Sequence, residues 1–291
     1  MRIKLLASAV LSLVALSVSA QTVQAWMSKD LGTAWRQGFK GQGTTITAID
    51  DFNSNYGFYG KLNGITQYGR HGEWTATEAN LIAPRATIRG IDYNTGTTIP
   101  LARGLNVLNL SYGMMANAGY ASLRWSAQET SIINYAKNGT AIISKSAGND
   151  SGIAIGAANR DGQVDYLGRD LIGAQSAIFV GALNTNGTTT AKATMASYSN
   201  IAGNNLTVQK QFLTVGVDAN QTGLAGTSFA APIITGYAAI LGSKFTKATP
   251  TQITNQLLTT ARTDTISGYS ASVHGRGEAS LSRALSPIAI K

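Results

Sequence analysis

The sequence contains no cysteine among its 291 residues. This absence excludes disulfide bonds, thiol nucleophiles, cysteine-ligated metals and a lipid-anchoring cysteine. Histidine is almost as scarce, since His71 and His274 are the only two. A mechanism that needs an imidazole therefore has few candidates. A chain of this length, 44% hydrophobic, can build one sizeable core without disulfide bonds.

Acidic residues are also few. The chain has 14 Asp and Glu residues and 23 Lys and Arg residues, which gives a formal net charge of +9. The basic residues are scattered along the chain, so we expect no nucleic-acid footprint. Such a surplus is typical of a surface that attracts acidic polymers without specificity.

The N-terminus carries a conspicuous apolar stretch. Arg2 and Lys4 precede residues 5–18, which contain no acidic residue, and residues 18–20 are the small residues of a cleavage site. The stretch is too short to span a bilayer comfortably, as a membrane anchor would. We predict a signal peptide over 1–20, with Ala25 as a later cut site, and one domain over 26–291. The protein is then exported, to the periplasm or the medium of a bacterium, without stable membrane insertion.

Short β-branched runs alternate with helical segments along the rest of the chain. The expected buried strands cover residues 44–49, 87–91, 105–110, 140–144 and 177–183. A helix is expected over 126–137, ended by Asn138-Gly139, and another behind the capping box that starts at Thr249. This alternation predicts an α/β fold with a parallel sheet between helices, and functional sites at the carboxyl ends of the strands.

Four polar residues stand at such strand ends and helix starts. Asp50 follows the first strand, His71 begins a helical segment, Asn149 follows the fourth strand, and Ser228 precedes a long apolar helix. A serine hydroxyl at a helix N-terminus can act as a nucleophile when a histidine takes its proton and a carboxylate orients the histidine. The Asn149 amide and the Ser228 backbone N–H would then stabilise the oxyanion.

Each of these residues also has an ordinary structural interpretation. A serine before a helix is usually an N-cap, and an aspartate after a strand usually belongs to a turn. Asn149 fits an ordinary turn, and His71 fits a hydrogen-bonded core histidine. Their joint occurrence in one order, each at an element boundary, favours catalysis. His274 lies in a glycine-rich turn without such partners, so we expect it to be structural.

The motifs resemble those of the subtilisin-like serine peptidases. Residues 45–51 (TITAIDD), His71-Gly72, 107–113 (VLNLSYG), 147–149 (AGN) and 226–232 (GTSFAAP) are similar to family segments, in the family's order Asp, His, Asn, Ser. The resemblance extends over about residues 32–285. The tail over 256–285 is closest in style to passenger peptidases of bacterial autotransporters, and we expect no accompanying β-barrel.

The resemblance implies a sheet of about seven parallel strands and a serine endopeptidase of broad specificity. The triad would be Asp50, His71 and Ser228, with Asn149 in the oxyanion hole. The walls of the primary specificity pocket, which bind substrate, would be formed by Ser111, Tyr112, Gly113, Ala147 and Gly148. Asp150 lies where a carboxylate can reach the base of that pocket, which favours basic or polar substrate side chains. The expected partners are polypeptide substrates.

Several positions depart from the family pattern. Asp51 follows Asp50 directly and leaves a second candidate for the catalytic acid. Glu73 places a carboxylate near the imidazole, which would raise the pKa of His71. No prodomain of the usual size fits before Gly32. Either folding needs no internal chaperone, or a separate inhibitor or propeptide-like chain supplies one.

Other functions remain open at this point. A subtilisin-like scaffold that binds peptides and cuts them weakly is one, although it has no need of all four polar residues. The related sedolisins are another, but they carry an aspartate at the oxyanion position, where this chain has Asn149. No cofactor is required for the proposed chemistry. Structural calcium is common in the family, but Asp161, Asp165 and Asp170 are too dispersed to indicate a site.

Overall fold

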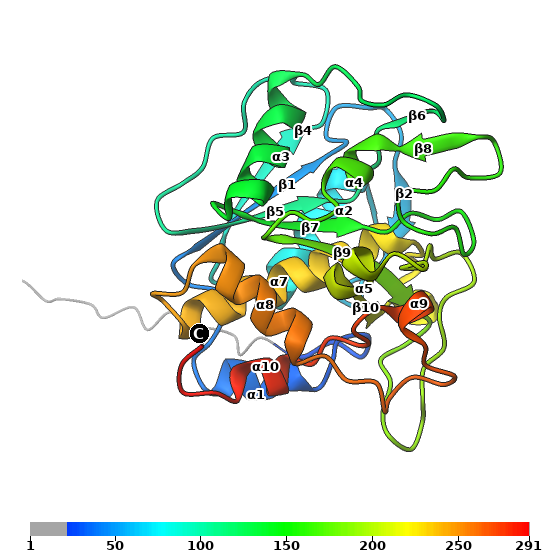
Figure 1. Ribbon diagram of the computed structural model, residues 1–291. Coiled ribbons are helices and arrows are strands. Elements are labelled where there is room, and N and C mark those ends of the chain that lie inside the picture. Colours follow the sequence, from blue (N-terminus) through cyan, green and yellow to red (C-terminus); the bar gives the residue numbers. More distant parts are fainter. Residues whose placement is uncertain (1–21, 291) are drawn as a thin grey trace, which may run out of the picture.

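The computed structural model describes residues 22–290. The predicted signal peptide over 1–20 lies outside this range. Within it, a six-stranded parallel sheet has the order β10-β9-β7-β5-β1-β4 (Figure 1). The strands are β1 (Thr44–Asp50), β4 (Thr87–Asp92), β5 (Leu105–Leu110), β7 (Ile142–Ser146), β9 (Ala177–Leu183) and β10 (Phe212–Gly216). The predicted α/β class is confirmed, with six strands where about seven were expected.

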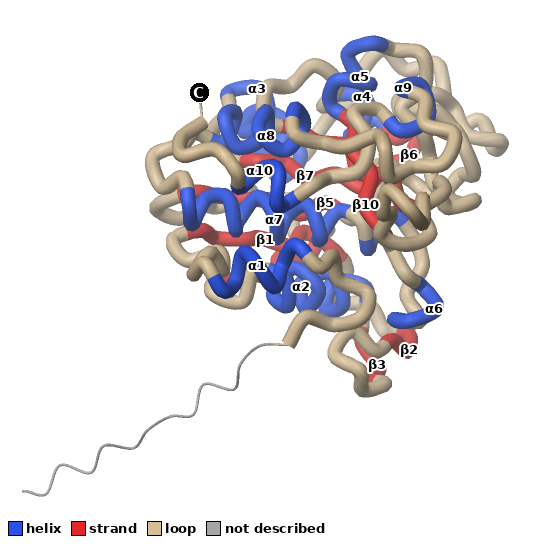
Figure 2. Tube along the Cα trace, turned by 90° about the horizontal axis from the view of Figure 1, so that it is seen from below, coloured by secondary structure: helices blue, strands red, loops and turns tan. Residues whose placement is uncertain are grey.

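Helices cover both faces of this sheet (Figures 1 and 2). One face packs against α1 (Asp30–Arg36), α2 (His71–Ile82), α7 (Ala231–Lys244), α8 (Pro250–Thr259) and α10 (Leu281–Leu285). The other packs against α3 (Ala127–Asn138), α4 (Tyr166–Asp170) and α5 (Leu206–Gln211). The shorter helices are α6 (Ala219–Thr222) and α9 (Ala271–His274).

Helix α7 is the centre of the larger core. Every residue from Ala231 to Ser243 is buried, as expected of a helix that is apolar all round. The 3₁₀ turn η1 (Thr227–Phe229) precedes it. Ser228 therefore lies in this turn, just before the helix that the sequence predicted to start around it.

Two small antiparallel sheets flank the carboxyl ends of the main strands. One pairs β2 (Phe58–Gly60) with β3 (Gln67–Gly69), and the other pairs β6 (Met115–Asn117) with β8 (Gln163–Asp165). The first separates β1 from α2 in the chain. The second lies beside α4 and borders the cavity described below. Among residues 22–290 no helix is long and apolar enough to cross a bilayer.

Candidate active site

The predicted triad acid and base are in direct contact. Asp50 ends the buried strand β1 and is 1% exposed. Its Oδ1 lies 2.5 Å from His71 Nδ1 and also accepts the Asp51 backbone N–H at 2.7 Å. Its Oδ2 accepts the Thr75 hydroxyl at 3.1 Å. Three neighbours therefore hold this carboxylate in place.

This arrangement fixes which imidazole nitrogen is free. An ionised carboxylate can only accept hydrogen bonds, so the proton of the Asp50–His71 contact lies on Nδ1. In neutral His71, Nε2 then carries the lone pair. A base oriented in this way is what a serine nucleophile requires.

The neighbouring carboxylates have other partners. Asp51 accepts hydrogen bonds from the Ser54 backbone, at 2.8 Å, and from the Ser54 hydroxyl. Slight burial raises the pKa of Asp51, but these bonds outweigh it and lower the pKa overall. Glu73 accepts the Arg70 backbone N–H at 2.9 Å and pairs with the Arg70 guanidinium at 2.9 Å. Asp50, not Asp51, thus orients His71, and Glu73 caps the start of α2.

Ser228 lies in the turn before α7, next in the chain to a residue that packs near His71. The ring of its neighbour Phe229 is 5.8 Å from the His71 ring, between centroids. The Ser228 side chain is largely buried, and its hydroxyl donates to the Ser111 carbonyl oxygen at 3.2 Å. Among residues 22–290 no hydrogen bond joins Ser228 to His71. Catalytic contacts are often long before substrate binds, and a hydroxyl reorients by one rotation about χ1.

Asn149 is held by Thr227. Its Oδ1 accepts the Thr227 backbone N–H at 2.8 Å and the Thr227 hydroxyl at 3.0 Å. A backbone N–H can only donate, so the amide must present its oxygen to Thr227 and its NH₂ group elsewhere. The Thr227 hydroxyl also accepts the Gly148 N–H at 3.0 Å. One threonine therefore orients the side chain that was predicted from sequence.

Gly226 lies close to two hydrogen-bond donors. Its φ of 131° lies in a region that favours glycine. A Cβ at this position would be 3.3 Å from Asn149 Nδ2 and 3.8 Å from Ser228 N. Both N–H donors thus border the same small volume. An oxyanion in that volume would find the two donors that its stabilisation needs.

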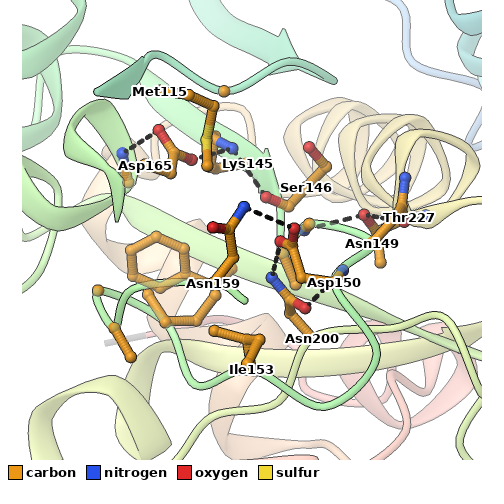
Figure 3. A pocket seen from close by; sticks show the side chains of 18 of the residues that line it. Met115, Lys145, Ser146, Asn149, Asp150, Ile153, Asn159, Asp165, Asn200 and Thr227 are labelled. Carbon is orange, nitrogen blue, oxygen red and sulfur yellow. Dashed lines mark hydrogen bonds and ion pairs between the residues drawn. The ribbon is translucent and has the colours of Figure 1, made fainter. Parts of the chain in front are cut away.

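A cavity of about 260 Å³ opens next to Ser228 and Asn149 (Figure 3). Its lining includes all five residues predicted to bind substrate, namely Ser111, Tyr112, Gly113, Ala147 and Gly148. The Tyr112 hydroxyl is buried without a hydrogen-bond partner in the described part of the chain. Burial, and then the charges of Glu129 and Asp165, raise the pKa of Tyr112, so the phenol stays a donor.

Several residues of this region were not predicted from the sequence. Thr75 and Thr227 position the acid and the amide, as described above. Phe58 places its ring 6.2 Å from the His71 ring, and Lys145 reaches the cavity from strand β7. The one sequence signal for Lys145 was its position next to buried strand residues. Lys145 was not predicted because the expected strand ended one residue earlier, at Ser144.

The remaining candidates lie elsewhere. His274 is buried in α9, where its Nδ1 lies 3.2 Å from the Ser270 carbonyl oxygen, and its ring stacks on Tyr269. This setting is consistent with the structural role expected for it. Within residues 22–290 no group of three or more His, Asp or Glu is placed to hold a metal.

Comparisons with known proteins come from a family profile and from solved structures. The profile described as "Subtilase family" matches residues 42–277. No curated protein matches the chain. The prenylagaramide maturation protease PagA is 20% identical at a TM-score of 0.54, over 89% of this chain and 98% of its own.

Two further proteases show the same likeness. MycP1 from Mycobacterium smegmatis is 19% identical at a TM-score of 0.55, covering 93% of this chain and 86% of its own. A lanthipeptide protease is 18% identical at 0.54, covering 87% and 91%. At such identities the structures show a shared fold, and the family profile shows the relationship. The chain belongs to the subtilase family, whose fold supports a peptidase function.

Proposed function

We propose that the chain is an exported serine endopeptidase that cleaves peptide bonds through an acyl-enzyme. The observation that carries this proposal is the 2.5 Å contact between His71 Nδ1 and the buried Asp50 carboxylate, with the ring of Phe229, the residue after Ser228, 5.8 Å from the His71 ring. It makes His71 Nε2 the nitrogen available to take the Ser228 proton. Export is part of the proposal because of the basic start and apolar stretch of residues 1–20.

The proposed reaction has two halves, formation of the acyl-enzyme and its hydrolysis, and each polar residue has the same role in both. Ser228 Oγ turns from the Ser111 carbonyl, attacks the peptide carbonyl carbon and transfers its proton to His71 Nε2. Asp50 stabilises the imidazolium that forms. The negative oxygen accepts hydrogen bonds from Asn149 Nδ2 and the Ser228 backbone N–H. His71 then protonates the leaving amine, and water repeats the sequence on the acyl-enzyme.

The substrate would bind in an extended conformation. In this proposal its backbone pairs with the segment Ser111-Tyr112-Gly113, and the side chain before the scissile bond enters the cavity between that segment and Ala147-Gly148. Backbone hydrogen bonds of this kind supply affinity with little dependence on sequence. In this proposal the bound polypeptide continues on both sides of the scissile bond, as the substrate of an endopeptidase does.

A second candidate is a subtilisin-like scaffold that binds peptides and cleaves them weakly. The observation in its favour is the Ser228 hydroxyl, which is hydrogen-bonded to Ser111 and not to His71. In this alternative Ser228 stays unreactive when a peptide is bound.

A fluorophosphonate probe tests which candidate applies. It reacts covalently only with a serine that a neighbouring base activates. We expect labelling of the wild type and casein hydrolysis, and neither activity in Ser228→Ala, where loss of the nucleophile lowers kcat by about 10⁶-fold. Ser197→Ala, at an exposed serine, is the matched control and should label like the wild type. A folded wild type that neither labels nor hydrolyses casein supports the binding scaffold.

A further inference from the structure

Lys145 brings a positive charge to the cavity beside Ser228. It occupies the second-to-last position of the central strand β7 and is 1% exposed. Its strand neighbours are Leu110 of β5 and Phe179 of β9. The side chain lies with those of Met115 and Asp165 at one end of the cavity (Figure 3). We refer to Lys145 and Asp165 as the floor pair.

The floor pair is firmly held but has one donor unused. Lys145 Nζ lies 2.9 Å from Asp165 Oδ2 and donates to the Ser146 carbonyl oxygen at 2.9 Å. Asp165 Oδ1 accepts the backbone N–H groups of Met114 at 3.0 Å and Gly168 at 3.1 Å. An ammonium has three protons, and residues 22–290 provide acceptors for two of them. The third can be donated to a ligand oxygen.

Asp150 adds a carboxylate on the wall of the same cavity. Its Oδ1 accepts the Asn159 amide at 3.1 Å, and its Oδ2 accepts the Asn200 amide at 2.9 Å. These amides are neutral, and no cation of the described chain lies within ion-pair distance of Asp150. The charged groups of the lining are thus one ammonium donor and two carboxylates, each of which has lone pairs for a further donor, and the Tyr112 hydroxyl, unpartnered within residues 22–290, lies in the same lining.

This set of groups discriminates among substrate side chains. An apolar side chain would expel water from the free ammonium proton and the carboxylates without replacing its hydrogen bonds. A substrate carboxylate meets two like charges. A substrate cation can pair with a carboxylate, but it meets the like charge of Lys145 and offers no acceptor for the free ammonium proton. A primary carboxamide satisfies both kinds of group, because its oxygen accepts from Lys145 and its NH₂ donates to Asp165 or Asp150.

The geometry points to a primary specificity pocket for glutamine and, with a shorter reach, asparagine, in which Lys145 is the specificity-determining residue. This inference rests on the proposed peptidase function, since it assigns the side chain that precedes the cleaved bond.

The test compares internally quenched peptides that differ only in the residue before the scissile bond, namely Gln, Glu, Lys, Leu or Phe. Fluorophosphonate labelling first counts the active sites. We expect kcat/KM for Gln to exceed that for Leu and Phe by about 10–100-fold, since unpaired polar groups in a pocket penalise apolar analogues. Faster cleavage after Leu or Phe, or after Lys or Glu, overturns the inference.

A double variant tests the role of Lys145 itself. Lys145→Met with Asp165→Asn removes both charges of the floor pair together, because a single substitution would leave an uncompensated charge. Asn keeps the acceptor for Gly168 and Met114. In the double variant we expect the ratio of kcat/KM for the Gln peptide to that for the Leu peptide to fall at least tenfold, with labelling by the probe retained. The matched control, Lys137→Met with Asp161→Asn, changes two exposed residues and should keep the wild-type preference.

The outcomes separate the two proposals. A wild type that is labelled by the probe but prefers apolar residues retains the peptidase function and loses the carboxamide pocket. A wild type that is neither labelled nor active on any peptide loses both. If the double variant does not fold, the wild-type peptide series still decides the specificity, and an unchanged preference in a folded double variant removes Lys145 from the role.

Discussion

Thr227 links the nucleophile to the oxyanion side chain at the scale of single residues. Its backbone N–H and hydroxyl both donate to Asn149 Oδ1, and its hydroxyl accepts the Gly148 N–H. It immediately precedes Ser228, so the two N–H donors near Gly226 are set by adjacent residues of one turn. Thr227 is therefore a positioning residue that acts through Asn149.

Replacing Thr227 by valine should lower kcat by about tenfold and leave KM within about twofold, because the hydroxyl orients a donor that acts in the transition state. Asn149→Ala should lower kcat by about 10²–10³-fold. In the double variant the valine should add little, since the side chain that it positions is already gone. Steady-state kinetics of the four proteins measure this coupling.

Thr227→Ser keeps the hydroxyl and serves as the matched control, with kcat close to that of the wild type. Fully additive losses in the double variant, together with a lower melting temperature for valine, would mean that Thr227 only supports the fold. In that case the orientation of Asn149 comes from another contact.

The sequence predicted four polar residues of the candidate site because each stands next to an element boundary. Asp50, His71, Asn149 and Ser228 could be proposed from their joint order at strand ends and helix starts and from the family resemblance, without knowledge of side-chain orientation. The floor pair could not, because Asp165 belongs to strand β8 of a small separate sheet and only folding brings it to Lys145. The contact of Phe58 with His71 likewise depends on how the β2–β3 hairpin closes over the site.

At the scale of elements, the strand cores were predictable and their ends less so. Strand β7 begins at Ile142, not at 140, because the Thr140 N–H still donates to the Tyr135 carbonyl of the preceding helix. Gly139 has the left-handed conformation that was predicted for it, with φ of 64°. Strand β10 was missed: it follows α5 without a linker and is a short run at the edge of the sheet.

Helices α2 and α7 approach each other closely at Gly236. A Cβ at this position would lie 2.4 Å from Ile82 Cγ2 and 2.7 Å from Ile82 Cβ, which are closer than atoms can pack. We expect Gly236→Ala to destabilise the protein by about 1–3 kcal/mol through overpacking, despite the better helix propensity of alanine. Because α2 carries His71 at its start, the shift should also lower kcat.

Gly32→Ala is the matched control for this substitution. Its added Cβ would lie 3.3 Å from the end of the flexible Arg36 side chain and from Val23. Alanine in helix α1 should therefore be neutral, or stabilising by up to about 1 kcal/mol. Thermal unfolding of both variants measures the difference. Equal melting temperatures would show that the α2–α7 contact adjusts to the added methyl group without loss of stability.

At the scale of the whole molecule, the stability of the fold should depend on pH through Glu78. This side chain points into the core from helix α2 and is 2% exposed. Its carboxyl has no hydrogen bond or cation in the described part of the chain, and Oε2 is buried without a partner. Burial therefore raises the pKa of Glu78 well above its ordinary value. Burial raises the pKa of the nearby Tyr198, the Gly226 backbone lowers it in part, and the charge of Glu78 raises it further.

The sign of the effect follows from this raised pKa. The folded protein binds the Glu78 proton more tightly than the unfolded chain, whose glutamate has a pKa near 4.5. The contribution to stability is complete below that pH and is lost as the pH rises toward the folded-state pKa. Glu78→Gln keeps the shape of the side chain but removes the ionisable carboxyl group. The melting temperature of the variant at pH 8 should therefore exceed that of the wild type, by about 2–4 °C for each kcal/mol gained. The two should converge near pH 4. Asp161→Asn, at an exposed carboxylate, should follow the wild type throughout, and a Gln variant that melts lower at pH 8 would mean that the Glu78 carboxylate has a stabilising partner in solution.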